Sequence, residues 1–270
     1  MVPLAVRQLV ARWLGRQAWL APRHWWVTEL LRDHAERDPD AYHRFLWAHH
    51  LGYAETYEIP LRFGAANIHQ TRHLLFADLH ACLWGRGVDP ARDIGSVFEV
   101  GCSMGYLLRF IETDVFPGAA TLAGIDIDRY AIRSGSTWLR TQGSKVQIAA
   151  ADMADLSAVL GERRFDVILC AGVLMYLHRA AAADVVRVML QHAGRVVALA
   201  GLAHPERDNG ELDESDVRRR DGTFIHNFDA MVRQGGGRVV ARRWEGARMV
   251  DGNTVYFVLA EATDRKGQAQ

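Results

Sequence analysis

The sequence predicts an α/β fold, a doubly wound, mostly parallel seven-stranded sheet with an antiparallel C-terminal hairpin, preceded by an N-terminal helical cap. Three observations support this prediction. Upstream of Ser96, apolar residues recur at helical spacing. Downstream of it, short apolar runs alternate with helical patterns. The last two β-like runs are joined by a turn too short for a parallel crossover, so they should pair antiparallel.

The N-terminal part should contain four helices, around residues 4–20, 25–36, 40–56 and 68–85. We divide the chain into a helical extension or cap (1–94), a ligand-binding domain (95–262) and a polar tail (263–270). Eight of the twelve histidines and six of the eight tryptophans precede Ser96. We therefore interpret the extension as an aromatic cap that packs on the sheet.

The second part should contain five parallel strands followed by the hairpin. The expected strands are 97–101, 122–126, 146–151, 165–171 and 196–201, and the expected hairpin pairs 238–244 with 254–259. Helical patterns lie between the strands, around 104–113, 128–141, 154–161 and 180–192. Strands that are apolar throughout indicate a parallel sheet covered on both faces. Right-handed crossovers between such strands give a doubly wound fold.

Composition narrows the function classes. Thirty-two basic residues balance thirty-two acidic ones, so the net charge gives no argument for nucleic-acid binding. Three scattered cysteines indicate neither a disulfide framework nor a zinc ribbon, and a reduced, cytoplasmic location is expected. No apolar run is long enough to span a membrane. His69 and His73 stand four residues apart, but no glutamate follows His69, and we predict no metal.

The first 28 residues carry four arginines and no acidic residue. Apolar residues, Leu9 and Trp13 among them, recur there at helical spacing, with Arg12 and Arg16 towards another face. Three interpretations are open. The favoured one is a helix that docks on the domain. The segment could instead lie on an anionic membrane surface as a peripheral contact, or be a cleaved transit peptide.

The stretch from Val97 to Gly105 is typical of a strand, a tight turn and the start of a helix. Gly101 permits the turn and a close approach of the backbone to a ligand, and Gly105 allows the helix to pack closely. A dinucleotide site would need glycine where Ser103 and Tyr106 stand. Glu99 would repel a diphosphate but suits a ligand that carries an ammonium and a sulfonium. NAD is therefore a poor fit.

Acidic residues recur at the next strand ends. Asp126 ends the second strand, Asp152 follows the third, and Phe165–Cys170 forms the fourth. With the glycine turn, this pattern resembles the class I, Rossmann-like S-adenosylmethionine-dependent methyltransferases over residues 95–262. The resemblance implies S-adenosyl-L-methionine as the cofactor, with Glu99 and the Gly101–Gly105 turn at its binding site.

The same resemblance assigns roles to single residues. Asp126 would accept hydrogen bonds from the ribose hydroxyls, Ile127 would lie against the adenine, and Asp152–Met153 would contact its amino group. Cys170 would end beside the methyl donor, although Cys102 and Cys170 are also typical small core residues. Asp128 is expected to cap the following helix, and Asp166 is expected to be structural.

A different reaction class shares one motif. Gly101-x-Ser103-x-Gly105 matches the nucleophile elbow of α/β hydrolases, and Asp166 or Asp126 with His178 or His204 would complete a triad. An elbow normally follows several strands and an oxyanion-hole loop, whereas this chain is helical upstream. A methyltransferase-like module without catalytic activity is a further alternative.

The resemblance implies methyl transfer by in-line displacement to a small or medium organic acceptor, through oxygen or nitrogen. A base is needed only where the acceptor must lose a proton, and His226, then His178 and Tyr176, are the candidates at the right sheet edge. The cap would cover the acceptor through Tyr53, Tyr57 and Phe63. The basic clusters are short, so nucleic acid is not expected, and a tRNA or protein acceptor is the alternative among methyltransferases.

Overall fold

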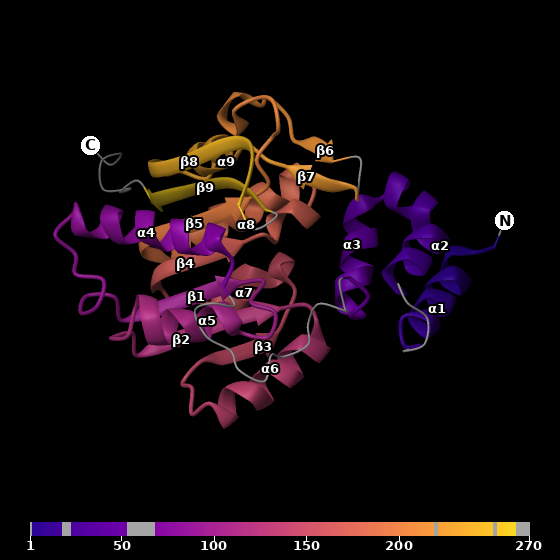
Figure 1. Cartoon of the computed structure of the whole chain (residues 1–270), viewed down its shortest axis with the longest axis horizontal. Coiled ribbons are helices and arrows are strands. Elements are labelled where there is room, and N and C mark those ends of the chain that lie inside the picture. Colours follow the sequence, from indigo (N-terminus) through magenta and orange to yellow (C-terminus); the bar gives the residue numbers. More distant parts are fainter. Residues whose placement is uncertain (1, 18–22, 53–67, 219–220, 251–252, 263–270) are drawn as a thin grey trace.

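The computed structural model of the chain describes residues 2–17, 23–52, 68–218, 221–250 and 253–262 (Figure 1). The helices are α1 (Leu4–Leu14), α2 (Arg23–Arg37), α3 (Pro39–Ala48), α4 (Gln70–Trp84), α5 (Tyr106–Phe110), α6 (Arg129–Thr141), α7 (Leu156–Leu160), α8 (Arg179–His192) and α9 (Phe228–Gln234). The strands are β1 (Ser96–Val100), β2 (Thr121–Asp126), β3 (Gln147–Ala150), β4 (Phe165–Ala171), β5 (Ala193–Gly201), β6 (Asp216–Arg218), β7 (Thr223–Ile225), β8 (Gly237–Val250) and β9 (Asn253–Ala262).

Seven of these strands form one sheet, in the order β3-β2-β1-β4-β5-β9-β8. The first five strands of the sequence run parallel, while β9 pairs antiparallel with both β5 and β8. The predicted fold class is confirmed, including the closing hairpin. Because the order reverses beside β1, the carboxyl ends of β1 and β4 open a crevice between them, where ligands bind in such sheets.

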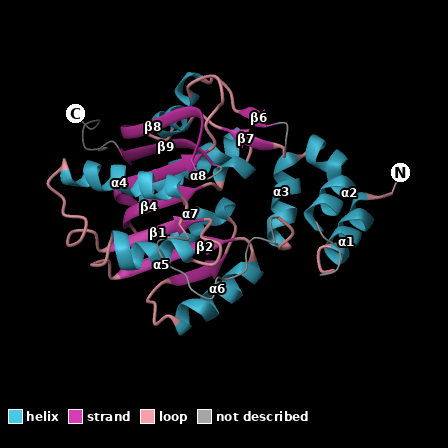
Figure 2. Cartoon of the chain, in the orientation of Figure 1, coloured by secondary structure: helices cyan, strands magenta, loops and turns pink. Residues whose placement is uncertain are grey.

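Both faces of the sheet are covered, which explains its uninterrupted apolar strands (Figure 2). Successive residues of β4 point to opposite sides. Ile168 and Cys170 belong to a core shared with α7, α8 and α9. Val167 and Leu169 belong to a second core shared with α4, α5 and α6.

The helices before the sheet fall into two groups. Helix α4 packs on the sheet through Leu75, Leu79 and Leu83, which are almost fully buried. Helices α1, α2 and α3 have a small core of their own around Leu31 and Leu46 and lie beside the sheet at the right of Figure 1. The division of the chain at residues 94 and 95 stays a prediction. Among the described residues, none of the helices combines the length and apolarity needed to cross a bilayer.

Two local features differ from the expected pattern. The stretch between β5 and α9, expected to be a loop, contains a hairpin of β6 and β7. Strands of three residues are too short to show an alternating pattern. The helix expected at 104–113 is α5, continued by a π-helical turn at Ile111–Val115.

Helix α6 packs directly on the glycine turn after β1. Asp128 caps the helix as expected, since its side chain accepts hydrogen bonds from the amides of Tyr130 and Ala131 (2.9 and 3.0 Å). Gly135, in the middle of α6, faces the backbone of Met104. A Cβ atom at Gly135 would lie 2.3 Å from the Met104 carbonyl oxygen. The absence of a side chain at this position therefore sets how closely α6 approaches the turn.

We expect Gly135→Ala to destabilise the protein, although alanine is the better helix former by about 1 kcal/mol. The methyl group meets backbone that is fixed by the sheet, and such overpacking costs about 2 kcal/mol. Thermal unfolding measures the loss. Thr137→Ala, at an exposed position of the same helix, is the control. An unfolding temperature for Gly135→Ala equal to or above that of the wild type would contradict the close packing.

Candidate active site at the carboxyl edge of the sheet

A cavity of about 530 Å³ lies at the carboxyl ends of β1, β2 and β4, where α3 and α4 face the sheet. Most of the predicted cofactor residues line it, namely Glu99, Gly101, Ser103, Asp126, Ile127, Asp152 and Met153. Of the predicted catalytic residues, Tyr176 lines it. The crevice expected from the strand order is thus present in the structure as a cavity.

The turn after β1 is held by β2. The amides of Gly101 and Cys102 both donate to the carbonyl oxygen of Ile125, at 2.8 and 2.9 Å. Gly101 has φ 76° and Ser103 has φ 48°, so two residues of the turn adopt the left-handed conformation. A Cβ atom on Gly101 would lie 2.4 Å from Val173. A glycine is therefore required there by both the conformation and the space.

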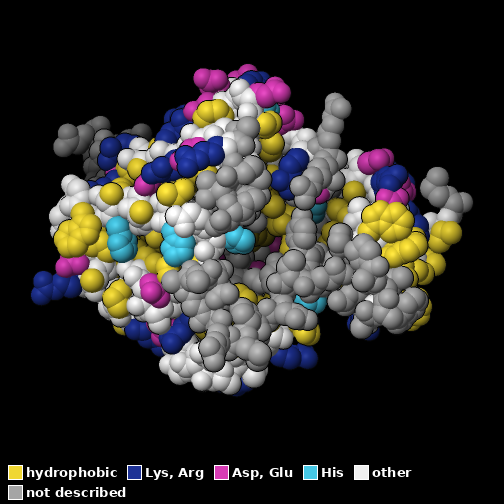
Figure 3. Space-filling model, in the orientation of Figure 1, with side chains coloured by type: hydrophobic (Ala, Val, Ile, Leu, Met, Phe, Trp, Pro, Cys, Tyr) yellow, Lys and Arg dark blue, Asp and Glu magenta, His cyan; other side chains and the backbone are white. Residues whose placement is uncertain are grey.

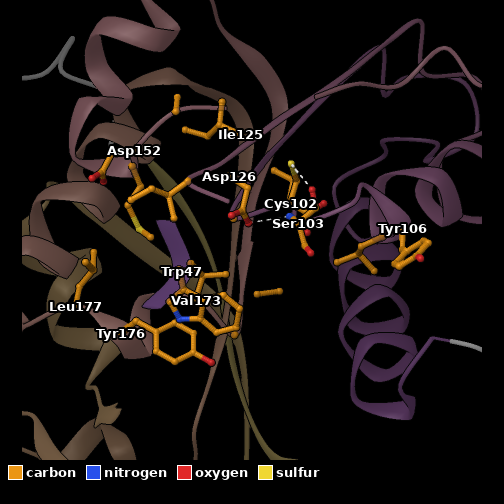
Figure 4. Close-up of a pocket in the computed structure, with 18 of the residues that line it drawn as sticks. Trp47, Cys102, Ser103, Tyr106, Ile125, Asp126, Asp152, Val173, Tyr176 and Leu177 are labelled. Atoms are coloured by element: carbon orange, nitrogen blue, oxygen red, sulfur yellow. Dashed lines mark hydrogen bonds between the residues drawn. The ribbon is translucent and has the colours of Figure 1, made fainter. Parts of the chain in front are cut away.

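Asp126 faces the cavity from the end of β2 (Figure 4). One carboxylate oxygen accepts from the Ser103 amide (2.8 Å) and the other from the Asp128 amide (2.9 Å). Burial raises the pKa of Asp126, and these backbone hydrogen bonds oppose the rise. A carboxylate offers about four acceptor positions, so a fixed Asp126 still has positions for two ligand hydroxyls.

Glu99 is the least satisfied polar group of the cavity. Its side chain is 4% exposed, and Oε2 has no hydrogen-bond partner among the described residues. Burial raises the pKa of Glu99 to about 8, and the positive charge of Arg72 partly opposes that rise. A buried carboxyl group without a partner is costly. The geometry is therefore that of a group which receives a cationic or donating ligand.

Arg72, from the first turn of α4, is the functional residue that the sequence reasoning missed. It lines the cavity, and its guanidinium donates to the carbonyl oxygen of Ala171 at 2.9 Å. One feature of the sequence could have identified Arg72. Arg72 stands at helical spacing within the apolar stripe of Ile68, Leu75 and Leu79, where a charge is out of place. Arg72 and Glu99 give the cavity one basic and one acidic side chain.

Asp152 lies at the end of β3. Its side chain accepts from the Ala154 amide at 2.9 Å and caps a short 3₁₀ turn. It also lies 3.4 Å from the guanidinium of Arg44 on α3. Asp152 is therefore partly occupied by structural contacts while still lining the cavity.

Helix α3 covers the cavity with the aromatic side chains of His43 and Trp47. The Tyr176 ring lies 5.1 Å from that of Trp47 and 5.2 Å from that of His43 (Figure 4). His50, just after the helix, contacts the Asp128 carboxylate at 2.5 Å. Helix α3 is thus fixed over the sheet edge. Three residues predicted to contact the acceptor lie outside the described residues, namely Tyr53, Tyr57 and Phe63.

The structure does not support His226 as the base. Its side chain is buried away from the cavity lining, with Nε2 3.0 Å from the Leu174 carbonyl oxygen and Nδ1 2.7 Å from the Ser215 hydroxyl. Burial lowers the pKa of His226 to about 4, so the ring is neutral at pH 7. A carbonyl can only accept, so Nε2 donates to Leu174 and Nδ1 accepts from Ser215. Both ring nitrogens are used in holding the fold.

Three other predicted site residues lie outside the cavity lining, namely His178, Cys170 and Gly105. His178 precedes α8, where its amide donates to Asp40 and its ring meets Phe224 edge to face. Cys170 is fully buried in the core, and the cavity is lined instead by Ala171 and Gly172, which follow it. Gly105 also lies behind the lining, where it caps α5 with φ 80°. A one-residue offset along a buried strand reverses the face on which a side chain lies.

The hydrolase arrangement is absent from the described residues. Asp166 is at the opposite edge of the sheet, where its carboxylate accepts from the amides of Gly95 and Ser96, so it is structural as expected. His204 is bonded to Asp216 and to the backbone that follows it. Neither His178 nor His204, the two histidines considered for a triad, lines the cavity with Ser103. The described part of the chain also shows no group of three or more metal-ligating side chains.

Comparison with known proteins agrees with this geometry. Residues 97–197 match the family model of a methyltransferase domain. The matched residues therefore form a methyltransferase domain. This confirms the family that the sequence resembled, and the matched range contains the glycine turn, Asp126 and Asp152. A comparison with curated proteins found no significant match.

Solved structures share the fold of the methyltransferase domain and extend over more of the chain. Magnesium protoporphyrin IX methyltransferase from Synechocystis PCC 6803 with bound SAM is 14% identical, with a TM-score of 0.51 over 87% of this chain and 97% of its own. The same enzyme with bound SAH is 13% identical, with a TM-score of 0.52 over 87% of this chain and 100% of its own. A protein from Pyrococcus horikoshii OT3 is 14% identical, with a TM-score of 0.51 over 78% of this chain and 100% of its own. At these identities the likeness establishes the fold.

The buried neutral His226 predicts a pH-dependent stability. Its pKa is about 6.5 when unfolded and about 4 when folded, so between these values the unfolded state binds the extra proton. The contribution of His226 to the free energy of unfolding is therefore complete above pH 6.5. It is lost as the pH falls towards 4, and the loss is up to about 3 kcal/mol. Urea unfolding of wild type and His226→Gln across this range measures the effect.

The free energy of unfolding should fall more steeply with acidification for the wild type than for His226→Gln. Parallel curves for the two proteins would mean that His226 titrates normally. The resonances of the His226 ring in an NMR titration give an independent value of its pKa.

Proposed function

We propose that the chain transfers a methyl group from S-adenosyl-L-methionine to a small or medium-sized, partly apolar organic acceptor, at oxygen or nitrogen. One observation carries the cofactor assignment. Arg72 on α4 and Glu99 near the end of β1 place a basic and an acidic side chain in the cavity, and Asp126 lies at the next strand end. The amino-acid end of the cofactor is a zwitterion followed by a ribose, and this order of groups matches it.

Each group of the cofactor has a counterpart among the lining residues. The unpartnered Glu99 would receive the ammonium, and Arg72 the carboxylate. Asp126 would hold the ribose hydroxyls, with Ile127 and Met153 on the adenine and Asp152 near its amino group. Gly101 and Gly172 both have positive φ, and the backbone approaches the cavity closely at these two residues. This would leave room for the part of the cofactor that joins its amino-acid end to its ribose.

The bound cofactor supplies a methyl group that is attached to a sulfonium. The sulfur leaves as a neutral thioether, so no acid is needed to protonate the leaving group. The residues of the chain therefore act mainly by alignment and by excluding water. Helix α3 provides both, because Trp47 and His43 cover the cavity opposite the end of β4 and contact Tyr176. An aromatic wall of this kind suits a partly apolar organic molecule better than an RNA backbone.

His43 is a better placed base than His226. It lines the cavity, and burial lowers its pKa, so it is neutral at pH 7. Its Nε2 lies 3.3 Å from the Gly222 carbonyl oxygen, which can only accept. The proton of the neutral ring is thus on Nε2, and Nδ1 carries the free electron pair. An acceptor hydroxyl would give its proton to Nδ1 as its oxygen forms the bond to the methyl carbon. An acceptor nitrogen would attack as the neutral amine through its electron pair and would give a proton to Nδ1 after the bond has formed.

A labelling experiment tests the function. The protein is incubated with S-adenosylmethionine that carries a labelled methyl group and with an extract of the cells that make it. Label in the small-molecule fraction supports the proposal. Label in precipitated RNA or protein would identify a macromolecular acceptor. Cofactor binding without transfer to any fraction would indicate a binding module.

Cofactor binding should release a proton through Glu99. With a pKa of about 8, Glu99 is almost fully protonated at pH 6.5 in the free protein. A bound ammonium stabilises the carboxylate and lowers this pKa, so about one proton should leave for each cofactor bound. Calorimetry at pH 6.5 in two buffers of different ionisation enthalpy counts the protons.

Glu99→Gln is the matched variant, since it keeps the shape and removes the titration. It should bind the cofactor about tenfold more weakly and release no proton through this position. Equal proton release by the two proteins would place the cationic group elsewhere.

His43→Gln should reduce turnover by about 100-fold while leaving the affinity for the cofactor within twofold of wild type. The acidic limb of the pH profile of kcat/KM, which reports the free base, should disappear with it. His192→Gln is the control, because His192 lies at the opposite edge of the sheet against the Arg163 carbonyl oxygen. An unchanged pH profile in His43→Gln would mean that the acceptor needs no base from this residue.

A further inference from the structure

Helix α1 exposes its apolar face. Ala11 is fully buried towards α2 and α3. The opposite side of the helix carries an apolar stripe at spacings of four, three, one and three residues, formed by Val2, Val6, Leu9, Val10 and Trp13. Leu9 is 60% exposed and Trp13 is 57% exposed. An amphipathic helix in a globular protein normally turns such a stripe to the core.

The contacts that hold α1 in place are on its other side. The guanidinium of Arg7 binds the Asp33 carboxylate and the Leu30 carbonyl oxygen of α2. Its orientation is therefore fixed by an ion pair and a buried alanine, with the stripe directed outwards. The favoured expectation was a helix docked on the domain. It docks on α2 through its polar side, so the stripe is free to bind something else.

Helix α2 extends this surface. Its first turns carry Trp25 and Trp26, which are 48% and 43% exposed and meet each other edge to face. We call the stripe of α1 together with these two tryptophans the α1–α2 apolar surface. Figure 3 shows apolar side chains gathered at this end of the molecule, with basic ones beside them. Contiguous apolar surface of this kind marks an interaction site.

The charge of this end indicates the partner. Residues 1–37 contain six arginines and three acidic residues, in a chain whose formal net charge is zero. Arg12 and Arg16 lie together on one flank of the stripe, on the side of His49. Of the acidic residues, Glu29 is paired with Arg32, and Asp33 with Arg7 and Arg37. The charge left beside the apolar surface is positive.

We propose that the α1–α2 apolar surface docks the protein on an anionic lipid bilayer. Exposed tryptophans and aliphatic residues would enter the interface between headgroups and acyl chains, while Arg12 and Arg16 would meet lipid phosphates. A second copy of this chain fits less well, because two copies of the same basic surface would repel each other. This docking is independent of the proposed methyl transfer.

Docking would also place the cavity near the lipid. Helix α3 packs on α2 in the small core of Leu31 and Leu46, and the same helix carries His43 and Trp47 over the cavity. The lipid-facing helices and the cavity roof are therefore one packed unit.

Sedimentation with vesicles tests the proposal. Vesicles of phosphatidylcholine with one-quarter phosphatidylglycerol are compared with vesicles of phosphatidylcholine alone, at low and high salt. The wild type should bind the anionic vesicles at least tenfold more tightly, and less so at high salt. The double variant Leu9→Gln/Trp13→Gln should lose at least tenfold of this binding. Trp84→Gln is the matched control, since Trp84 is 58% exposed on α4 in the sheet part of the molecule.

A second variant, Arg12→Glu/Arg16→Glu, leaves the stripe intact and should remove the preference for anionic vesicles. Thermal unfolding checks that each variant folds. Failure of the wild type to bind either vesicle, or binding that neither variant weakens, would overturn the proposal. A concentration-dependent dimer in gel filtration that Leu9→Gln/Trp13→Gln dissociates, without vesicle binding, would assign the surface to a second copy instead.

Discussion

The attachment of the glycine turn to the end of β2 is the interaction on which the cavity depends. The Ile125 carbonyl oxygen accepts from two successive amides of the turn, and the next amide, that of Ser103, donates to Asp126. These three hydrogen bonds fix the backbone that would face the ligand and, at the same time, the carboxylate beside it. Helix α6 completes the arrangement from outside, because Gly135 lets it rest on the backbone of the same turn.

The electrostatics of the cavity follow from that rigidity. Glu99 is held near the end of a buried strand, where its side chain is almost fully buried and Oε2 has no partner among the described residues. Such a group favours a ligand with a positive end, and Arg72 on the other side favours a negative one. A zwitterionic ligand would supply a partner of opposite charge for each of these two side chains. The methyltransferase domain is in this sense arranged for a charged small molecule before any acceptor arrives.

The N-terminal helices add a layer that the fold of the domain does not require. Helix α3 is tied to the sheet edge through His50 and Asp128, and through Arg44 and Asp152. Helices α1 and α2 pack on α3 but turn apolar side chains outwards. The side of this helical unit formed by α3 therefore completes the cavity. The side formed by α1 and α2 is exposed and lies beside a positive charge. The two surfaces are linked by a single small core.

The parallel strands with their closing hairpin, the glycine turn and the acidic residues at the strand ends could all be predicted from the amino-acid sequence. Those features arise from short-range periodicity and from the fixed edge at which parallel strands end, so neighbouring residues are sufficient to reveal them. Only the tertiary structure decided which side chains surround the cavity. Cys170 belongs to the core on one face of the sheet, and His226 follows β7 and is hydrogen-bonded to Leu174 and Ser215. Arg72, His43 and Trp47 reach the cavity from helices far upstream, and the way in which helices pack over a sheet depends on contacts that local patterns do not contain.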